Sequence, residues 1–273
     1  MTIENAKAAL RVEAIRPGMG DATSFGPGVS FREMVSGACT ARGFSTGIVT
    51  IDPRAVLPYH VHTVCETLTF LSGAAIVHVE GRAYQLEPFD CICFPAGVAH
   101  QISNFSGDSP LMAVSALASP TPAQEPVSQV FAVEDRGTAN PGSADPESIV
   151  RFAQAEVYEL SPGALFRDLF AGRLGSVGIC GGYGRFQPGG SLPCHVHEYD
   201  ESITIVEGQA VCLVQGNRYM VGGYDTAFVP EGRPHRFLNH SNAPMAMVWV
   251  YAGSEPGRTL VESGYCDGTL AWP

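Results

Sequence analysis

The sequence predicts an all-β protein made of two consecutive domains of sandwich or barrel type. From Phe31 onward, short apolar runs are separated by glycine and proline, a pattern typical of short, closely spaced strands. Residues 118–150 are rich in Pro, Ser, Ala and Gly and indicate a linker, and the chain repeats itself on either side of it. A chain of 273 residues with 45% hydrophobic and 16% charged residues is long enough for two cores.

The elements follow in order along the chain. Alternating Leu10, Val12 and Ala14 predict an opening strand over residues 8–16, which ends at the Pro-Gly pair that follows. Within the linker, the run Asp-Pro-Glu at 145–147 resembles a helix start, so we expect a short helix over 146–154. The predicted domains are residues 1–117 and 151–273, joined by the linker 118–150.

The two halves of the chain are related by duplication. The run Phe31–Gly37 returns as Phe166–Gly172, and the same displacement of 135 residues carries His60 to His195 without a gap. It also relates Glu66 to Glu201. A register kept through every predicted turn indicates an internal repeat rather than chance similarity.

The residues with the clearest chemical meaning form a repeated histidine and glutamate pattern. Histidines two apart on a strand leave from the same face. Neutral imidazole and carboxylate together suit a first-row divalent ion such as Fe, Mn, Ni, Co or Zn, and four ligands leave two octahedral positions open for a substrate. We therefore expect one divalent metal per repeat, with iron as the leading ion. The two predicted ligand sets are His60, His62, Glu66 and His100, and His195, His197, Glu201 and His235.

The spacing His-x-His-x3-Glu-x6-Gly, followed by Pro-x-Gly-x2-His-x3-Asn, resembles the two motifs of the cupin superfamily. The resemblance covers about residues 31–115 and 166–252. With two copies of the motifs, the chain is similar to a two-domain bicupin. It implies two antiparallel β-barrels of jelly-roll type, each with a metal held inside by the ligands named above. Three positions depart from the family pattern, because Arg54, Phe89 and Tyr224 stand where the family usually has glycine; Gly189 keeps it in the second copy.

The reaction is less constrained than the metal site. Side chains expected on the ligand face are apolar in both copies: Leu68, Phe70 and Ile102, then Ile203, Ile205 and Phe237. Such pockets, without a second carboxylate, favour an Fe(II)-type dioxygenase acting on a small organic substrate. A non-oxidative isomerase, decarboxylase or lyase is the alternative, and a non-enzymatic binding or sensor protein is the third hypothesis.

Two comparisons within the cupin resemblance refine these hypotheses. Oxalate decarboxylases usually carry arginine three residues before the first ligand histidine, where this chain has Leu57 and Leu192. Tyr183 and Arg185 alternate on the strand before the second motif, and we expect them to be catalytic, with Arg185 binding a substrate carboxylate. This polar environment and the complete opening motif favour the second site if only one is active.

Composition argues against several partners. The net charge is −11 and Lys7 is the only lysine, so neither nucleic acid nor an anionic membrane surface is an expected partner. No apolar run is long enough to span a membrane, and the first residues do not resemble a signal peptide. We expect a cytoplasmic protein whose eight scattered cysteines are free thiols. A homodimer is the expected assembly.

Overall fold

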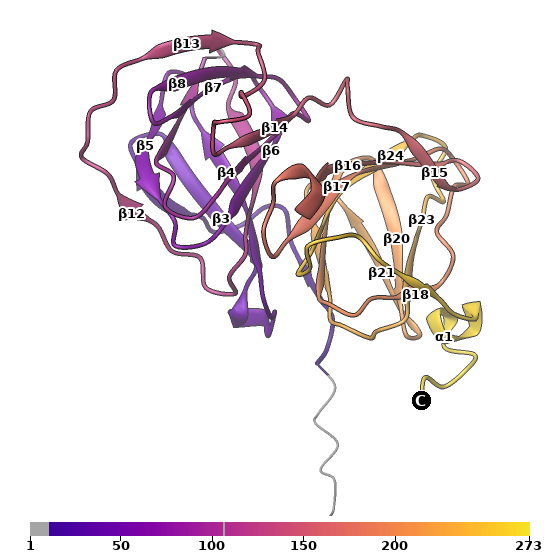
Figure 1. Ribbon diagram of the computed structural model, residues 1–273. Helices are drawn as coiled ribbons and strands as arrows, with labels where there is room; N and C mark the ends of the chain where they lie inside the picture. Colours follow the sequence, from indigo (N-terminus) through magenta and orange to yellow (C-terminus); the bar gives the residue numbers. More distant parts are fainter. Residues whose placement is uncertain (1–10, 106) are drawn as a thin grey trace, which may run out of the picture.

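The computed structural model describes residues 11–105 and 107–273 and confirms the predicted fold class. Two β-barrels lie beside each other, with the first half of the chain in one and the second half in the other (Figure 1). Among the described residues, no helix has the length and apolarity needed to cross a membrane. The predicted opening strand is shorter than expected, since β1 covers Ala14–Arg16, and residues 8–10 lie outside the described residues.

The first barrel is formed by two sheets, with strand orders β14-β9-β6-β11-β4-β3-β2 and β12-β5-β10-β7-β8-β13. Its inner faces carry an apolar core that includes the predicted Leu68, Phe70 and Ile102. The linker wraps the outside of this barrel through β12 and β13 (Figure 1). The strands are β2 (Thr23–Gly26), β3 (Val29–Val35), β4 (Ser45–Ile51), β5 (Val56–Val61), β6 (Glu66–Ser72), β7 (Ala75–Val79), β8 (Arg82–Leu86), β9 (Cys91–Phe94), β10 (His100–Asn104), β11 (Leu111–Leu117), β12 (Glu125–Pro126), β13 (Glu134–Gly137) and β14 (Ser148–Val150).

The second barrel repeats this arrangement with sheets β1-β22-β19-β24-β17-β16-β15 and β21-β20-β23-β18-β25. Its core includes the predicted Ile203, Ile205 and Phe237. The elements are β15 (Tyr158–Ser161), β16 (Ala164–Phe170), β17 (Cys180–Phe186), β18 (His195–Val196), β19 (Glu201–Glu207), β20 (Gln209–Val214), β21 (Asn217–Gly222), β22 (Thr226–Val229), β23 (His235–Leu238), β24 (Met245–Tyr251), β25 (Thr259–Leu260) and α1 (Ser263–Asp267).

The barrels exchange one strand each. Strand β1 comes first in the chain but pairs with β22 of the second barrel, whereas β14, just before the second repeat, pairs with β9 of the first. Buried carboxylates fix both strands. Glu13 accepts hydrogen bonds from Asn217 and Tyr219 and pairs with Arg233, whereas Glu147 is held by Arg82 and Tyr84 in the first barrel. Each barrel therefore completes its sheet with a strand from beyond its own repeat.

Strand β14 explains why the helix predicted over 146–154 is wrong. Ser148, Ile149 and Val150 are extended and pair with the edge of β9, which buries Ile149 in the first core. Asp145 accepts from the Gly142 N–H in a turn instead of capping a helix. Tertiary pairing of a short β-branched run overrides the local helix signal.

The prediction that all eight cysteines are free is also wrong. Cys194 and Cys266 form a disulfide, which joins the residue before His195 to helix α1. The other six are thiols, and five of these are buried. No local pattern indicates this pair, because the two residues are 72 positions apart and meet only through the fold.

Candidate metal centres

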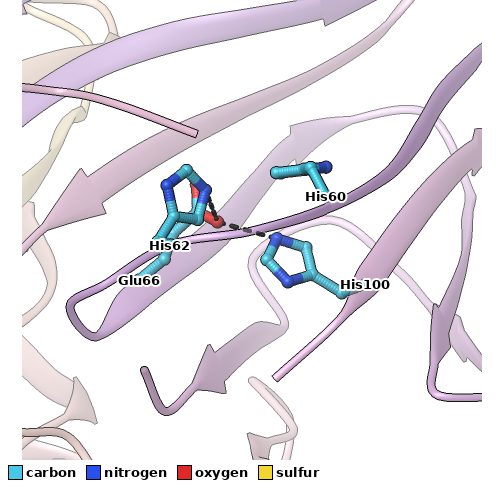
Figure 2. A group of neighbouring side chains, drawn as sticks. All are labelled: His60, His62, Glu66 and His100. Carbon is cyan, nitrogen blue, oxygen red and sulfur yellow. Dashed lines mark hydrogen bonds and ion pairs between the residues drawn. The ribbon is translucent and has the colours of Figure 1, made fainter. Parts of the chain in front are cut away.

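The structure brings each predicted ligand set together inside its barrel. In the first, β5 supplies His60 and the turn after it supplies His62, while Glu66 opens β6 and His100 opens β10. These side chains point toward one another, as Figure 2 shows, and their nearest ligand atoms all lie within 4.8 Å. The same holds for the second set, and all eight side chains are buried. The second set is His195, His197, Glu201 and His235.

Backbone carbonyls fix which nitrogen of each histidine faces the centre. In the first barrel, Nδ1 of His60, His62 and His100 lies 2.8, 2.5 and 3.0 Å from a carbonyl oxygen. Nδ1 atoms of the second set make the same contacts at 2.6–2.8 Å. A carbonyl only accepts, so Nδ1 carries the hydrogen and Nε2 presents its lone pair to the centre. This carbonyl contact is the usual support of a metal-ligating histidine.

The electrostatics of the first set match this assignment. Burial, together with the nearby His100, lowers the pKa of His60 to about 4, so this imidazole is neutral near pH 7. Burial raises the pKa of Glu66, but the electrostatic effect of the adjacent His62 and His100 outweighs it and holds the pKa well below its usual value. The same opposed causes lower the pKa of Glu201 in the second set.

These atoms fit a divalent cation. Glu66 Oε2 lies 3.0 Å from His62 Nε2 and 2.9 Å from His100 Nε2, so acceptor atoms converge on one point. Nε2 of His62 and of His197 has no hydrogen-bond donor or acceptor partner among the described residues. Converging lone pairs repel unless a positive ion lies between them, and three imidazoles with one carboxylate suit a first-row divalent metal. Each barrel thus has one three-histidine, one-glutamate metal site.

The departures from the glycine pattern do not disturb the turns that carry the ligands. Arg54, Phe89 and Tyr224 all have a positive φ of 66–69°, the left-handed conformation that glycine adopts at little cost. Holding a bulky residue there costs about 1 to 3 kcal/mol. For Phe89 the cost is offset by packing, since its ring contacts Phe152 and Tyr183 at 5.2 and 4.9 Å.

Among the described residues, three ligands of the first site line one cavity. It measures about 300 Å³ and reaches His60, His62 and Glu66, at the lower end of volumes typical of small-molecule pockets. Most of its wall is apolar. The remaining lining residues are Thr23, Phe25, Phe31, Glu33, Val49, Leu57, Ser115, Leu117, Pro122, Ala123 and Gln124.

The pockets beside the second site reach less of the metal centre. One of about 100 Å³ includes His197 in its lining but not the other three ligands, and one of about 420 Å³, lined by Asp168 and Arg258, includes none of the four. Tyr251, which pairs with Glu201 in the sheet, lies against the site with its ring 4.4 Å from that of His197. Trp249 packs beside Tyr251 at 4.8 Å. The expectation that the second site offers the better setting for catalysis is therefore not supported.

Sequence reasoning missed Glu33, a second carboxylate in the first cavity. It lies on β3 two residues after Phe31, and both line the cavity. The guanidinium of the neighbouring Arg32 donates to the carbonyls of Gly18 and Gly20. The period-two spacing from Phe31, an apolar residue on the same strand, was the signal that could have identified Glu33.

Tyr183 and Arg185 do not reach the metal, contrary to prediction. Tyr183 is buried between the barrels, where its ring packs against Phe152 and the neighbouring apolar side chains. Arg185 lies at the surface, 3.1 Å from Glu207. Both leave β17 on the face opposite Phe186, which lies in the barrel core. Alternation placed them on one face, but that face points away from the ligands.

Comparisons with known proteins agree with the fold. The family model described as "Cupin domain" matches residues 47–117 and 182–251. Oxalate decarboxylase from Lactobacillus farciminis, solved as a formate complex, is 15% identical, with a TM-score of 0.72 over 88% of this chain and 86% of that one. The S161A mutant of Bacillus subtilis oxalate decarboxylase is 16% identical, with a TM-score of 0.72 over 88% and 77%.

A third solved structure, from work on the Mn(II) centres of Bacillus subtilis oxalate decarboxylase, is 16% identical, with a TM-score of 0.70 over 86% and 75% of the two chains. No curated protein sequence matches this chain. At these identities the solved structures show a shared fold and leave the substrate open. The family model covers more than half of the chain, in two copies that each hold a complete ligand set. The chain therefore belongs to the cupin family, as a bicupin with one metal site in each barrel.

Proposed function

We propose that this bicupin is a metal-dependent enzyme of the non-oxidative type, an isomerase, decarboxylase or lyase, whose reaction takes place at the first site. The observation that carries the proposal is Glu33, a carboxylate that lines the same cavity as three of the metal ligands. Enolisation steps in these reaction classes need a group that accepts or returns a proton at the carbon next to a carbonyl. The second site is proposed to bind metal without catalysing a reaction.

The residues of the first cavity have different proposed roles. The apolar wall of Phe25, Phe31, Val49 and Leu57 holds the body of the substrate, and Glu33 is an exposed residue of the same lining. Ser115 donates to Glu66 Oε1 at 2.7 Å and so fixes the carboxylate that faces the histidines. Glu33 is free to exchange a proton with the substrate, since its described hydrogen bond, from Ser36 at 2.5 Å, uses one carboxylate oxygen. A bound divalent ion would supply Lewis-acid polarisation of a substrate oxygen.

This proposal replaces oxygenation as the leading hypothesis. The dioxygenase prediction depended on an apolar pocket with no second carboxylate, and Glu33 removes that premise. The expectation of iron has no support either. We propose Mn(II) as the first ion to test, because a solved structure with this fold is described by its Mn(II) centres and because the nitrogen and oxygen ligands suit it.

The test is proton exchange catalysed without oxygen. Protein loaded with Mn(II) is incubated under argon in D₂O with a panel of α-hydroxy ketones and 1,3-dicarbonyl compounds, and exchange is followed by NMR against free Mn(II). We expect Glu33→Gln to slow exchange by about 100-fold or more, the usual contribution of a general base. The matched control is Asp168→Asn at the equivalent position of the second barrel, where we expect less than a twofold change.

Each alternative has its own signature in this experiment. Oxygen uptake that is coupled to substrate loss in air, and that a control with free metal alone does not show, would restore the dioxygenase hypothesis. Binding of panel compounds with no exchange or turnover would favour the sensor hypothesis. Equal exchange by wild type and Glu33→Gln would show that Glu33 is not the base.

A further inference from the structure

The charged groups of the first cavity limit which substrates it can accept. Its carboxylates are Glu33 and Glu66, and neither lysine nor arginine is among the described residues that line it. With both carboxylates ionised, a divalent ion brings the sum of charges to zero. A dicarboxylate would then add two negative charges to an apolar cavity that has no cationic side chain to pair with them, which is costly.

The second barrel provides the contrast. Ala123 and Gly257 hold the same place, since each carbonyl accepts from Nδ1 of the second ligand histidine, His62 or His197. The residues that follow are Gln124 in the first copy and Arg258 in the second. Strand pairing confirms the equivalence, because β12 and β25 begin at the next position and pair with corresponding residues of β5 and β18. The first copy thus has a neutral amide where the second has a guanidinium.

The walls of the cavity suit an apolar body. Phe25 and Phe31 stack with centroids 5.3 Å apart and planes within 8°, which forms a flat aromatic surface. Leu57 and Leu117 complete the apolar lining, and Leu57 is the position at which the cupin resemblance led us to look for an arginine. The polar groups left for a substrate are uncharged hydroxyl and amide groups together with Glu33.

We propose that the first site binds neutral, enolisable compounds that have an apolar body and two carbonyl groups, such as 1,3-dicarbonyls. In this proposal Gln124 helps to exclude dianions. The inference rests on the proposed function. The C–H bond between the two carbonyls breaks, its proton bonds to a Glu33 carboxylate oxygen, and the electron pair spreads over the two substrate oxygens. The substrate becomes a monoanion as Glu33 becomes neutral, so the charge of the cavity is unchanged and no oxidant is needed.

A matched pair of probes tests the substrate class by binding alone. 2,4-Pentanedione and malonate are similar in size and chelate a metal through the same ring, but one is neutral and the other is a dianion. Binding to the Mn(II)-loaded protein is measured by calorimetry and by the change in the Mn(II) electron paramagnetic resonance spectrum. The His60→Ala variant gives the background from the second site. We expect pentanedione to bind at least about tenfold more tightly than malonate.

Substitution of Gln124 should weaken this preference. In Gln124→Arg we expect malonate to bind at least about tenfold more tightly than in wild type, with less than a threefold change for pentanedione. Arg258→Gln, the reciprocal change in the second barrel, should alter neither. Tighter binding of malonate than of pentanedione by wild type, or no binding of either probe at the first site, would overturn the substrate class. The proposed function fails on different evidence, namely proton exchange that is unaffected in Glu33→Gln.

Discussion

The two metal sites have the same ligands and the same carbonyl supports, yet three ligands of the first line a cavity of about 300 Å³, whereas one ligand of the second lines a cavity of about 100 Å³. The difference lies on β11 and β24, the strands that pair with the carboxylate strands β6 and β19. The inward positions are Ala113, Ser115 and Leu117 in the first barrel and Met247, Trp249 and Tyr251 in the second. Larger side chains fill the space that the first barrel leaves open.

The carboxylates beside the two sites differ in what they contact. Glu33 faces the open cavity, whereas its counterpart Asp168 is bound by Tyr158 at 2.5 Å and by Arg173. Tyr158 stands where the first barrel has Thr23, since each pairs with the equivalent phenylalanine of the next strand. One copy has the cavity and an available carboxylate, whereas the other uses the equivalent positions for packing. A ligand motif therefore identifies a metal site but not a catalytic one.

The largest expected difference between the sites is their response to loss of one ligand. His60→Ala and His195→Ala should each remove one of two bound metal ions, measured by elemental analysis of protein loaded with Mn(II). We expect activity to fall by roughly a thousandfold or more only in His60→Ala, because several kcal/mol of metal stabilisation are lost there. His195→Ala should act mainly through stability. Equal loss of activity in both variants, with both folded, would contradict a single catalytic site.

Packing at the second site should appear as stability. Trp249→Ser places the first barrel's residue in the second and should lower the free energy of unfolding by about 3 to 5 kcal/mol, as expected for truncation of a buried aromatic side chain. Trp249→Phe, which keeps most of the volume, should cost less than half as much. Denaturant unfolding of the metal-free protein measures both. A cost below about 1 kcal/mol for the serine variant would show that Trp249 is not needed to fill the barrel.

The smallest expected effect is a dependence on pH in the first site. Burial lowers the pKa of His60 from 6.5 to about 4, so the unfolded chain binds this proton first as pH falls. The stability that His60 contributes is therefore complete above about pH 6.5 and is lost toward pH 4, where the loss reaches roughly 3 kcal/mol. Burial also lowers the pKa of His62, but Glu66 outweighs it, and the pKa is raised, which gives a contribution of opposite sign.

Comparing metal-free wild type with His60→Gln isolates the His60 contribution. The difference in unfolding free energy between the two should shrink as pH falls from 6.5 to 4, as measured by urea unfolding at several pH values. A difference that does not vary with pH would mean that His60 titrates alike in the folded and unfolded chains.

The sequence predicted the fold class and all eight metal ligands because these depend on local spacing and on the repeat. His60 and His62 share a face by strand alternation, and the second copy confirms the register. It did not predict which site has a cavity, because Ser115 and Trp249 lie far from the motif and act by volume alone. The prediction for Tyr183 was wrong, because alternation shows that residues share a face but not which face points into the barrel. The cytoplasmic location and the homodimer stay predictions.

The reciprocal exchange of β1 and β14 has a consequence for how this chain can be divided. A gene cut in the linker would separate β1 from the sheet it completes, and one of the two products would lack Glu13, whose carboxylate is buried in the other half. Neither product would be a complete barrel, and each would have an open sheet edge prone to aggregation. Although its sequence reads as two modules, the protein is expected to unfold in a single cooperative transition, so that metal bound in either barrel protects both.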